Sequence, residues 1–188
     1  MVLVDVIRPP KIATRVWDST LIIAGAQIIA LCSQVAIPLA FSPIPITLQT
    51  LAVLLVGASL GSKRGALSLI LYLGEGALGA PVFAGGGSGL PYLFGPTGGY
   101  LLGFILSAYT VGRLAEREWD RTPAKTAIAM AIGNLAIYIP GLAWLSLFVG
   151  VKRILYVGFL PFIPGDILKI MLALILLPTV WQTIGRYR

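Results

Sequence analysis

Long stretches without a single charged residue dominate this 188-residue chain. One runs from Ser19 through Ser62, and another runs from Gly76 through Gly112. Both exceed the roughly 20 apolar residues that a helix needs to cross a bilayer. Glycines, prolines and charges divide the chain into six candidate spans, which are Ser19–Ala40, Pro45–Gly61, Gly65–Ala80, Thr97–Leu114, Ala124–Val149 and Phe159–Thr183. The pattern predicts an all-α integral membrane protein with six transmembrane helices.

We interpret the chain as a single membrane domain covering residues 1–188. Residues 1–18 would form a cytoplasmic N-terminal arm, and residues 81–96 would form an external, glycine-rich loop. The second and third spans are short and rich in glycine, so an arrangement with one re-entrant segment stays open. Composition supports the membrane class, because 57% of the residues are hydrophobic and only 11% are charged, against about 25% charged in soluble domains.

The basic residues are distributed unevenly between the loops. Eleven of the 14 lie in loops or tails on one side, and they are Arg8, Lys11, Arg15, Lys63, Arg64, Arg113, Arg117, Arg121, Lys125, Arg186 and Arg188. Only Lys152 and Arg153 lie on the other side. Because cytoplasmic loops are enriched in Lys and Arg, we expect both termini in the cytoplasm. This topology and the anionic lipid bilayer account for the net charge of +7, so nucleic-acid binding need not be invoked.

Several kinds of chemistry are excluded by the residues that are missing. The chain has no histidine and a single cysteine, which rules out the common zinc, heme and Ser–His sites. We therefore expect no metal site, no cofactor and no catalytic residue set. The sequence from Gly57 to Lys63 does not match a phosphate-binding P-loop, so any ATP hydrolysis must come from another chain.

An acid and an ammonium group lie three residues apart in the otherwise uncharged stretch Phe159–Thr183. Asp166 and Lys169 would share one face of a helix that starts after Pro164 and Gly165. Ionisable groups at membrane depth usually face a cavity, a partner charge or a substrate. The pair is the strongest candidate for ligand binding, and a purely structural ion pair within the helix is the alternative.

The glycine-rich loop is too apolar for an ordinary solvated loop. Irregular backbone near the membrane is tolerated where it is buried in protein or lines a cavity. Glycines such as Gly86 and Gly87 let backbone N–H groups approach a ligand, and Ser88 adds a hydroxyl. We interpret the loop as a lid over an outward-facing pocket, with apolar walls from Phe83, Tyr92, Phe94 and Tyr100. A tight crossover that only packs is the alternative.

Two further polar residues lie inside predicted spans. Gln49 would direct its amide into the outer half of the bundle, where it binds a ligand or another helix. Glu75 is the only charge in the third span, so ligand contact and structural pairing, for example with Lys169, are both open. Asn134, Tyr138 and Trp144 in the fifth span are weaker candidates, because such residues more often pack than bind.

Several motifs in order make the chain resemble the BioY family of biotin-binding S components of energy-coupling-factor (ECF) vitamin transporters. They are Pro43-Ile-Pro-Ile-Thr-Leu-Gln49, Leu60-Gly-Ser-Lys-Arg-Gly65, Gly79-Ala-Pro-Val-Phe-Ala-Gly-Gly86, Phe94-Gly-Pro-Thr-Gly-Gly-Tyr100 and Pro164-Gly-Asp-x-x-Lys169. The resemblance implies a six-helix bundle with both termini inside. It also implies that Asp166, Lys169 and Gln49 contact biotin while the glycine-rich loop closes over it.

The same resemblance implies partners for this chain. The first-span residues Ala26 and Ala30 would dock a transmembrane coupling subunit that carries two ABC ATPase subunits; a homo-oligomer stays open. Two positions depart from the family pattern, because some relatives have Asn where this chain has Gly87 and Arg where it has Leu101. The ligand for the biotin carboxylate is therefore left open between Ser88, loop N–H groups, Lys152 and Arg153.

These observations favour a substrate-binding protein for biotin uptake in the cytoplasmic membrane of a prokaryote, and not an enzyme. Aromatic walls suit the bicyclic body of biotin. A carboxylate would accept from the urea N–H groups, and an ammonium or amide would donate to the urea carbonyl. The alternatives are another vitamin, or a membrane enzyme that uses Glu75 and Asp166 as an acid–base pair.

Overall fold

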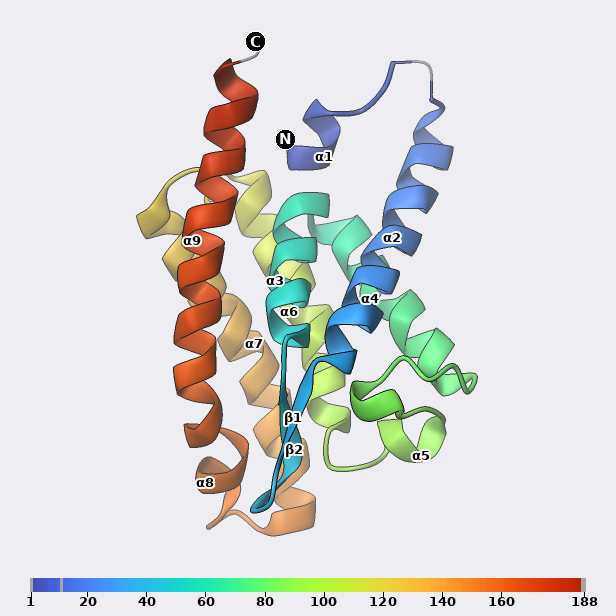
Figure 1. The fold of residues 1–188 in the computed structure, drawn as a ribbon, viewed down its shortest axis with the longest axis vertical. Coiled ribbons are helices and arrows are strands. Elements are labelled where there is room, and N and C mark those ends of the chain that lie inside the picture. Colours follow the sequence, from blue (N-terminus) through green and yellow to red (C-terminus); the bar gives the residue numbers. More distant parts are fainter. Residues whose placement is uncertain (1, 11, 187–188) are drawn as a thin grey trace.

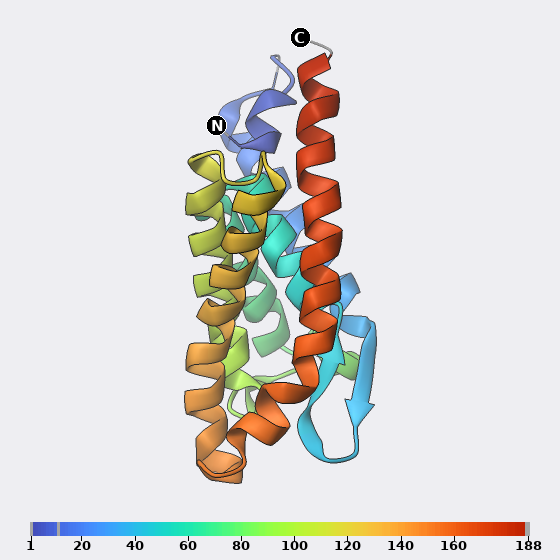
Figure 2. The same ribbon diagram turned by 90° about the vertical axis from the view of Figure 1, so that its left-hand side faces the viewer.

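Six long helices form an elongated bundle in the computed structural model, which describes residues 2–10 and 12–186 (Figures 1 and 2). They are α2 (Thr14–Gln34), α3 (Gln49–Leu60), α4 (Ser62–Ala77), α6 (Gly98–Glu116), α7 (Pro123–Val149) and α9 (Ile163–Arg186). Each falls on one of the six predicted spans. In the described part, three helical segments are long and apolar enough to cross a membrane, which are Thr14–Gln34, Pro123–Val149 and Ile154–Thr183. Lys11 and Arg188, which were counted in the charge argument, lie outside the described residues.

Helix α6 packs against α3, α4 and α7 in the interior of the bundle. Glycines make this close approach possible. A Cβ on Gly103 would lie 2.7 Å from the carbonyl oxygen of Ile137 on α7, and one on Gly57 would lie 2.7 Å from that of Ala108. Small residues at such contacts let helix backbones come together, so these glycines fix the positions of the helices that carry the polar side chains.

A β-hairpin joins α2 to α3, which corrects the all-α prediction. Its strands are β1 (Ala36–Leu39) and β2 (Ser42–Thr47), paired antiparallel with an irregularity between Ile37 and Leu39. The first predicted span therefore ends at Gln34. Pro43 and Pro45 lie in β2 instead of opening a helix. Proline is tolerated in such a strand because each strand of a two-stranded sheet is an edge, with one side free of ladder hydrogen bonds.

Short helices cap the hairpin end of the bundle (Figure 1). They are η1 (Ala84–Gly86), α5 (Leu90–Leu93), α8 (Ile154–Gly158) and η2 (Leu160–Phe162). The glycine-rich loop contains two single helical turns, η1 and α5. Gly85, Gly86 and Gly89 adopt positive φ angles there, which glycine accepts without steric cost.

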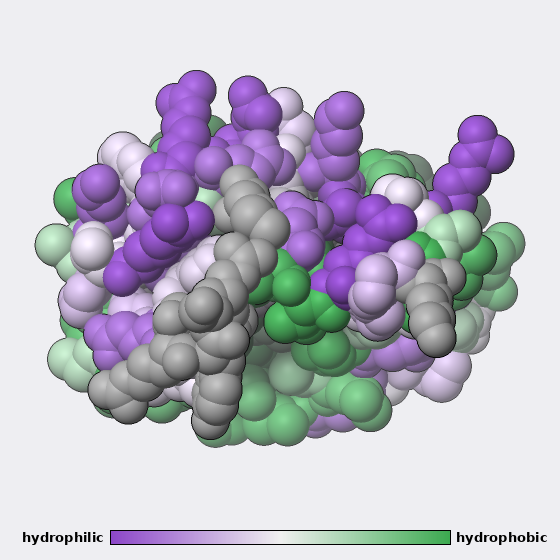
Figure 3. All heavy atoms as spheres, turned by 90° about the horizontal axis from the view of Figure 1, so that it is seen from above, coloured by the Kyte–Doolittle hydropathy of each residue, from purple (hydrophilic) through white to green (hydrophobic). Residues whose placement is uncertain are grey.

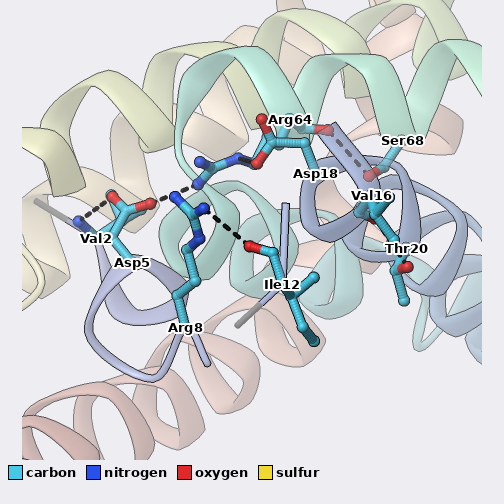
Figure 4. A network of polar contacts seen from close by, with 9 residues as sticks. All are labelled: Val2, Asp5, Arg8, Ile12, Val16, Asp18, Thr20, Arg64 and Ser68. Atoms are coloured by element: carbon cyan, nitrogen blue, oxygen red, sulfur yellow. Dashed lines mark hydrogen bonds and ion pairs between the residues drawn. The ribbon is translucent and has the colours of Figure 1, made fainter. Parts of the chain in front are cut away.

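The opposite end holds the N-terminal helix α1 (Leu3–Val6) and the end of α9 (Figures 1 and 2). Arg64 at the start of α4 binds two acids, Asp5 at 2.7 Å and Asp18 at 2.8 Å, and so ties α1 to α2 and α4 (Figure 4). Hydrophilic side chains are prominent on this end face (Figure 3). Helix α2 begins at Thr14, so residues 14–18 of the predicted arm are helical.

Candidate functional site

A cavity opens at the hairpin end of the bundle, between β2, α3, α6, α7 and α9. Its walls enclose about 600 Å3 of space, the open mouth included. The lining residues are Ile44, Pro45, Thr47, Gln49, Thr50, Ala84, Tyr92, Thr97, Tyr100, Leu101, Phe104, Asn134, Ile137, Tyr138, Phe162, Asp166 and Lys169. Ligand pockets are typically apolar with a few placed polar groups, and this cavity has that composition.

Asp166 and Lys169 both line this cavity, as the sequence predicted. Helix α9 begins at Ile163, so Asp166 lies in its first turn, where the helix dipole stabilises a carboxylate. Each of the two residues is 8% exposed. Lys169 Nζ lies 3.6 Å from Asp166 Oδ1. The spacing is longer than a hydrogen bond, which leaves Oδ1 available to a ligand.

Each member of the pair also has a partner on another helix. Tyr138 of α7 donates a hydrogen bond to Asp166 Oδ2. Lys169 Nζ donates to the hydroxyl of Thr50 on α3 at 2.7 Å. The carboxylate and the ammonium group are therefore held by three helices, and the arrangement is more than an ion pair within one helix.

Gln49, the first residue of α3, is 4% exposed and lines the cavity. Its Nε2 donates to the hydroxyl of Tyr72 on α4 at 2.7 Å. Tyr72 lies outside the cavity lining and is fully buried behind it. The predicted polar residue is thus at the cavity, and a second polar side chain holds it from behind.

Aromatic residues supply the apolar walls. Tyr100 lines the cavity, and its hydroxyl donates to the carbonyl oxygen of Gly158 at 2.8 Å. Tyr92 lines it as well and stacks on Phe83, with ring centroids 4.9 Å apart. Phe83 is fully buried outside the lining, so it supports a wall and does not form one.

The structure does not bring every predicted residue to the cavity. Glu75 lies on α4 outside the lining, and both of its carboxylate oxygens accept from Gln27 of α2, at 2.9 and 3.1 Å. Glu75 therefore neither pairs with Lys169 nor lines the cavity. Gly86, Gly87 and Ser88 also lie outside the lining, and Gly87 packs on the ring of Tyr92.

The first-span residues Ala26 and Ala30 were expected on a docking surface, but the structure places them inside the bundle. Ala26 is 0% exposed and Ala30 is 7% exposed. Helix α2 packs against α3 and α4, and a Cβ on neighbouring Gly25 would lie 2.5 Å from Ser68 Oγ of α4. Small residues here serve close packing within the chain.

Sequence reasoning undervalued one face of α7. Asn134 and Tyr138 both line the cavity. They are four residues apart, and this spacing puts them on one helix face. This spacing could be read from the sequence. The two residues were ranked as weak candidates because a polar residue in a bundle more often packs than binds. Trp144, the third weak candidate, instead donates to the carbonyl oxygen of Gly95 at 2.9 Å.

Taken together, the cavity offers an acceptor, a cation and an amide beside aromatic walls, which suits a small apolar molecule with a polar head. Within residues 2–10 and 12–186, no three His, Cys, Asp or Glu side chains lie close enough to hold a metal ion. The groups of Asp166, Lys169 and Gln49 can donate and accept hydrogen bonds to one ligand. The geometry therefore supports recognition of a ligand.

Comparisons with known proteins agree on one family. Residues 8–186 match the model of the BioY family. The biotin transporter BioY2 of Lactococcus lactis subsp. cremoris is 40% identical over 165 residues, covering 86% of this chain and 88% of that protein. The biotin transporter BioY of Rhodobacter capsulatus is 40% identical over 177 residues, covering 87% and 90%.

A solved structure has the same fold. It is the crystal structure of the S-component for biotin from an ECF-type ABC transporter, with a TM-score of 0.79 and 25% sequence identity. The alignment covers 91% of this chain and 95% of that chain. Since the family model spans nearly all of the sequence and these relatives match along most of their length, the chain belongs to the BioY family.

Proposed function

We propose that this chain is the biotin-binding S component of an ECF-type uptake transporter in the cytoplasmic membrane. The observation that carries the proposal is the buried Asp166–Lys169 pair, held by residues of two other helices at the polar side of an aromatic-lined cavity. Buried charges are retained where they pair or bind. The names of the relatives support the same ligand.

Biotin fits the chemistry of this cavity. Its ureido group has two N–H donors and one carbonyl acceptor. Asp166 Oδ1 accepts from one N–H group, and Lys169 donates to the ureido carbonyl. The fused rings lie against the aromatic walls formed by Tyr92 and Tyr100. Charge-assisted hydrogen bonds of this kind are stronger than neutral ones, so the ureido end supplies specificity.

Uptake by this protein requires energy from elsewhere. The chain has no P-loop, so a transmembrane coupling subunit with two ABC ATPase subunits would drive the transport step. All six long helices would cross the membrane, with both termini in the cytoplasm. The position of α1 and the end of α9 at one end of the bundle supports this arrangement.

An enzymatic role is disfavoured by the geometry. Such a role would use Glu75 and Asp166 as an acid–base pair, but Glu75 lies outside the cavity lining and binds Gln27. The relatives found are named as transporters. We therefore propose binding and uptake without chemical change of the ligand.

Calorimetry with the purified protein tests the proposal. We expect tight binding of biotin and no binding of thiamine or riboflavin at the same concentration. Asp166→Asn keeps the size of the side chain but removes its charge. Loss of a charge-assisted hydrogen bond costs about 1.5–3 kcal/mol, which corresponds to roughly 10- to 150-fold in affinity.

Asp18→Asn is the matched control, because Asp18 binds Arg64 at the opposite end of the bundle. Its affinity for biotin should equal that of the unmodified protein. Binding of thiamine or riboflavin in place of biotin would assign the cavity to another vitamin. Unchanged biotin affinity in folded Asp166→Asn would remove Asp166 from the site.

A further inference from the structure

Tyr72 is a buried polar residue that the binding scheme above does not use. It lies on α4 behind the cavity and is 0% exposed. Its hydroxyl group contacts two partners, the amide of Gln49 at 2.7 Å and the carbonyl oxygen of Val82 at 3.1 Å. Val82 lies in the glycine-rich loop, so Tyr72 connects the cavity to the loop above it.

The chemistry of these two partners fixes the direction of the hydrogen bonds. A backbone carbonyl only accepts, and a tyrosine hydroxyl has one proton to donate. The Gln49 amide faces Tyr72 with its Nε2, which donates to the Tyr72 oxygen, so the Tyr72 proton goes to the Val82 carbonyl. The carbonyl oxygen of that amide is then the end left for the cavity.

The Val82 carbonyl is itself held in place. Ser33 Oγ lies 2.5 Å from it, and the Gln34 amide donates to the carbonyl oxygens of Pro81 and Phe83 at 3.3 Å each. These contacts attach both sides of Val82 to the end of α2. The acceptor that orients Tyr72 is thus held by side chains of α2 and does not depend on a ligand.

Packing restricts the Tyr72 ring as well. Phe83 meets it edge to face, with centroids 5.5 Å apart, and the other side of Phe83 stacks on Tyr92. Gly76 makes room for Phe83, because a Cβ there would lie 2.0 Å from its Cζ. These contacts restrict the movement of the buried Tyr72 ring.

We propose that Tyr72 is a positioning residue that holds the Gln49 amide with its oxygen toward the cavity, so that the site demands an N–H donor from its ligand at that point. The proposal rests on the proposed function, since biotin is the ligand with ureido N–H donors. Asp166 would accept from one ureido N–H group and Gln49 from the other. Tyr72 thus acts on selectivity without touching the ligand.

A double-mutant cycle separates this role from general support of the fold. Tyr72→Phe frees the Gln49 amide to rotate, and we expect about tenfold weaker biotin binding, as for loss of one hydrogen bond in a buried site. In a Gln49→Met background, Tyr72→Phe should change the affinity less than twofold. Additive effects of the two substitutions would show that Tyr72 acts independently of Gln49 and would overturn the proposal.

Ligand analogues give a second readout that a merely structural role would not move. Biotin methylated on one or the other ureido nitrogen lacks one of the two donors. The unmodified protein should discriminate against both analogues. Tyr72→Phe should lose discrimination against only one of them, and Asp166→Asn against only the other. Equal discrimination by Tyr72→Phe and the unmodified protein would contradict the inference.

Tyr109→Phe is the matched control, since Tyr109 lies exposed on α6. If Tyr72→Phe does not fold, Gln49→Glu and Gln49→Met still test whether the Tyr72 hydroxyl donates its proton to Val82. Glu at this position would face the Tyr72 oxygen with an acceptor and should bind biotin more weakly than Met. Stronger binding by Glu would show that the Tyr72 proton is free. Absence of biotin binding by the unmodified protein would instead overturn the proposed function itself.

Discussion

The Asp166 carboxylate is held by a hydrogen-bond donor on another helix and by an ammonium group on its own helix. Tyr138 lies 28 residues earlier on α7 and donates to Oδ2, while Lys169 lies one turn later on the same helix as Asp166. A carboxylate oxygen held in this way keeps its remaining lone pairs in fixed directions. The orientation of Asp166 is therefore set before any ligand binds, which lowers the entropic cost of binding.

Tyr138→Phe tests this orientation. Removal of the hydroxyl leaves Oδ2 without its donor, and we expect biotin affinity to fall by about 5- to 15-fold, as for one hydrogen bond of roughly 1–1.5 kcal/mol. Calorimetry on the purified variant measures the change. Tyr109→Phe on the exposed side of α6 removes the same group without effect. An unchanged affinity for Tyr138→Phe would show that Asp166 is positioned by its own helix alone.

At this scale the sequence predicted the ionic part of the site well. Asp166 and Lys169 were recognisable because charges are rare within spans, and Gln49 because it is a polar residue inside a predicted span. Glu75 met the same criterion of rarity, yet it pairs with Gln27 on α2. Whether a helix face points to the cavity or to another helix depends on how the neighbouring helices pack. A local sequence pattern does not predict this packing.

Among the elements, the β-hairpin adds a wall to the cavity beside those that the helices form. Ile44, Pro45 and Thr47 of β2 line the cavity. Ser42 Oγ donates to the carbonyl oxygen of Val157 in α8 at 2.7 Å, so the hairpin is attached to the segment that precedes α9. These strands could not be predicted from the sequence, because apolar residues lie on both of their faces. The period-two alternation of apolar and polar residues that is typical of a half-buried strand is therefore absent.

Helix α2 offers a test of packing within the bundle. Ala26→Trp introduces an indole where the side chain is 0% exposed, and overpacking of this kind costs about 1–3 kcal/mol. We expect a lower midpoint of thermal unfolding in detergent. Ile23→Trp, at a position 53% exposed on the same helix, should leave the midpoint unchanged. Equal midpoints for the two variants would show that Ala26 does not pack against α4 in the folded protein.

The whole molecule has two chemically different ends. The basic residues at the starts of α2 and α4 lie at the end that holds α1, and the cavity opens at the other end. The distribution of Lys and Arg over successive loops predicted this difference between the two ends, because successive loops lie on alternate sides of the membrane. The sequence could place the cavity at one end of the bundle, but it could not identify the walls, since they come from eight separate elements.

Cysteine labelling in cells tests which end faces outward. In a Cys32→Ser background, Ser88→Cys should react with an impermeant thiol reagent added outside, and biotin should slow the reaction. Thr122→Cys, exposed before α7, should react only after the membrane is opened. Ser62 is unsuitable as the inner probe, because it is 2% exposed and bonded to Glu116. Reaction at Thr122→Cys from outside would reverse the proposed orientation.

The docking of α1 has a consequence for the order in which the molecule is completed. Val2, Leu3 and Val4 are buried, and Asp5 binds Arg64, which lies 59 residues later. At a synthesis rate of about 5–20 residues per second, the N-terminal segment leaves the ribosome roughly 3–12 s before its partner exists. The segment that holds Asp5 therefore reaches its native place only after α3 and the start of α4 have been made.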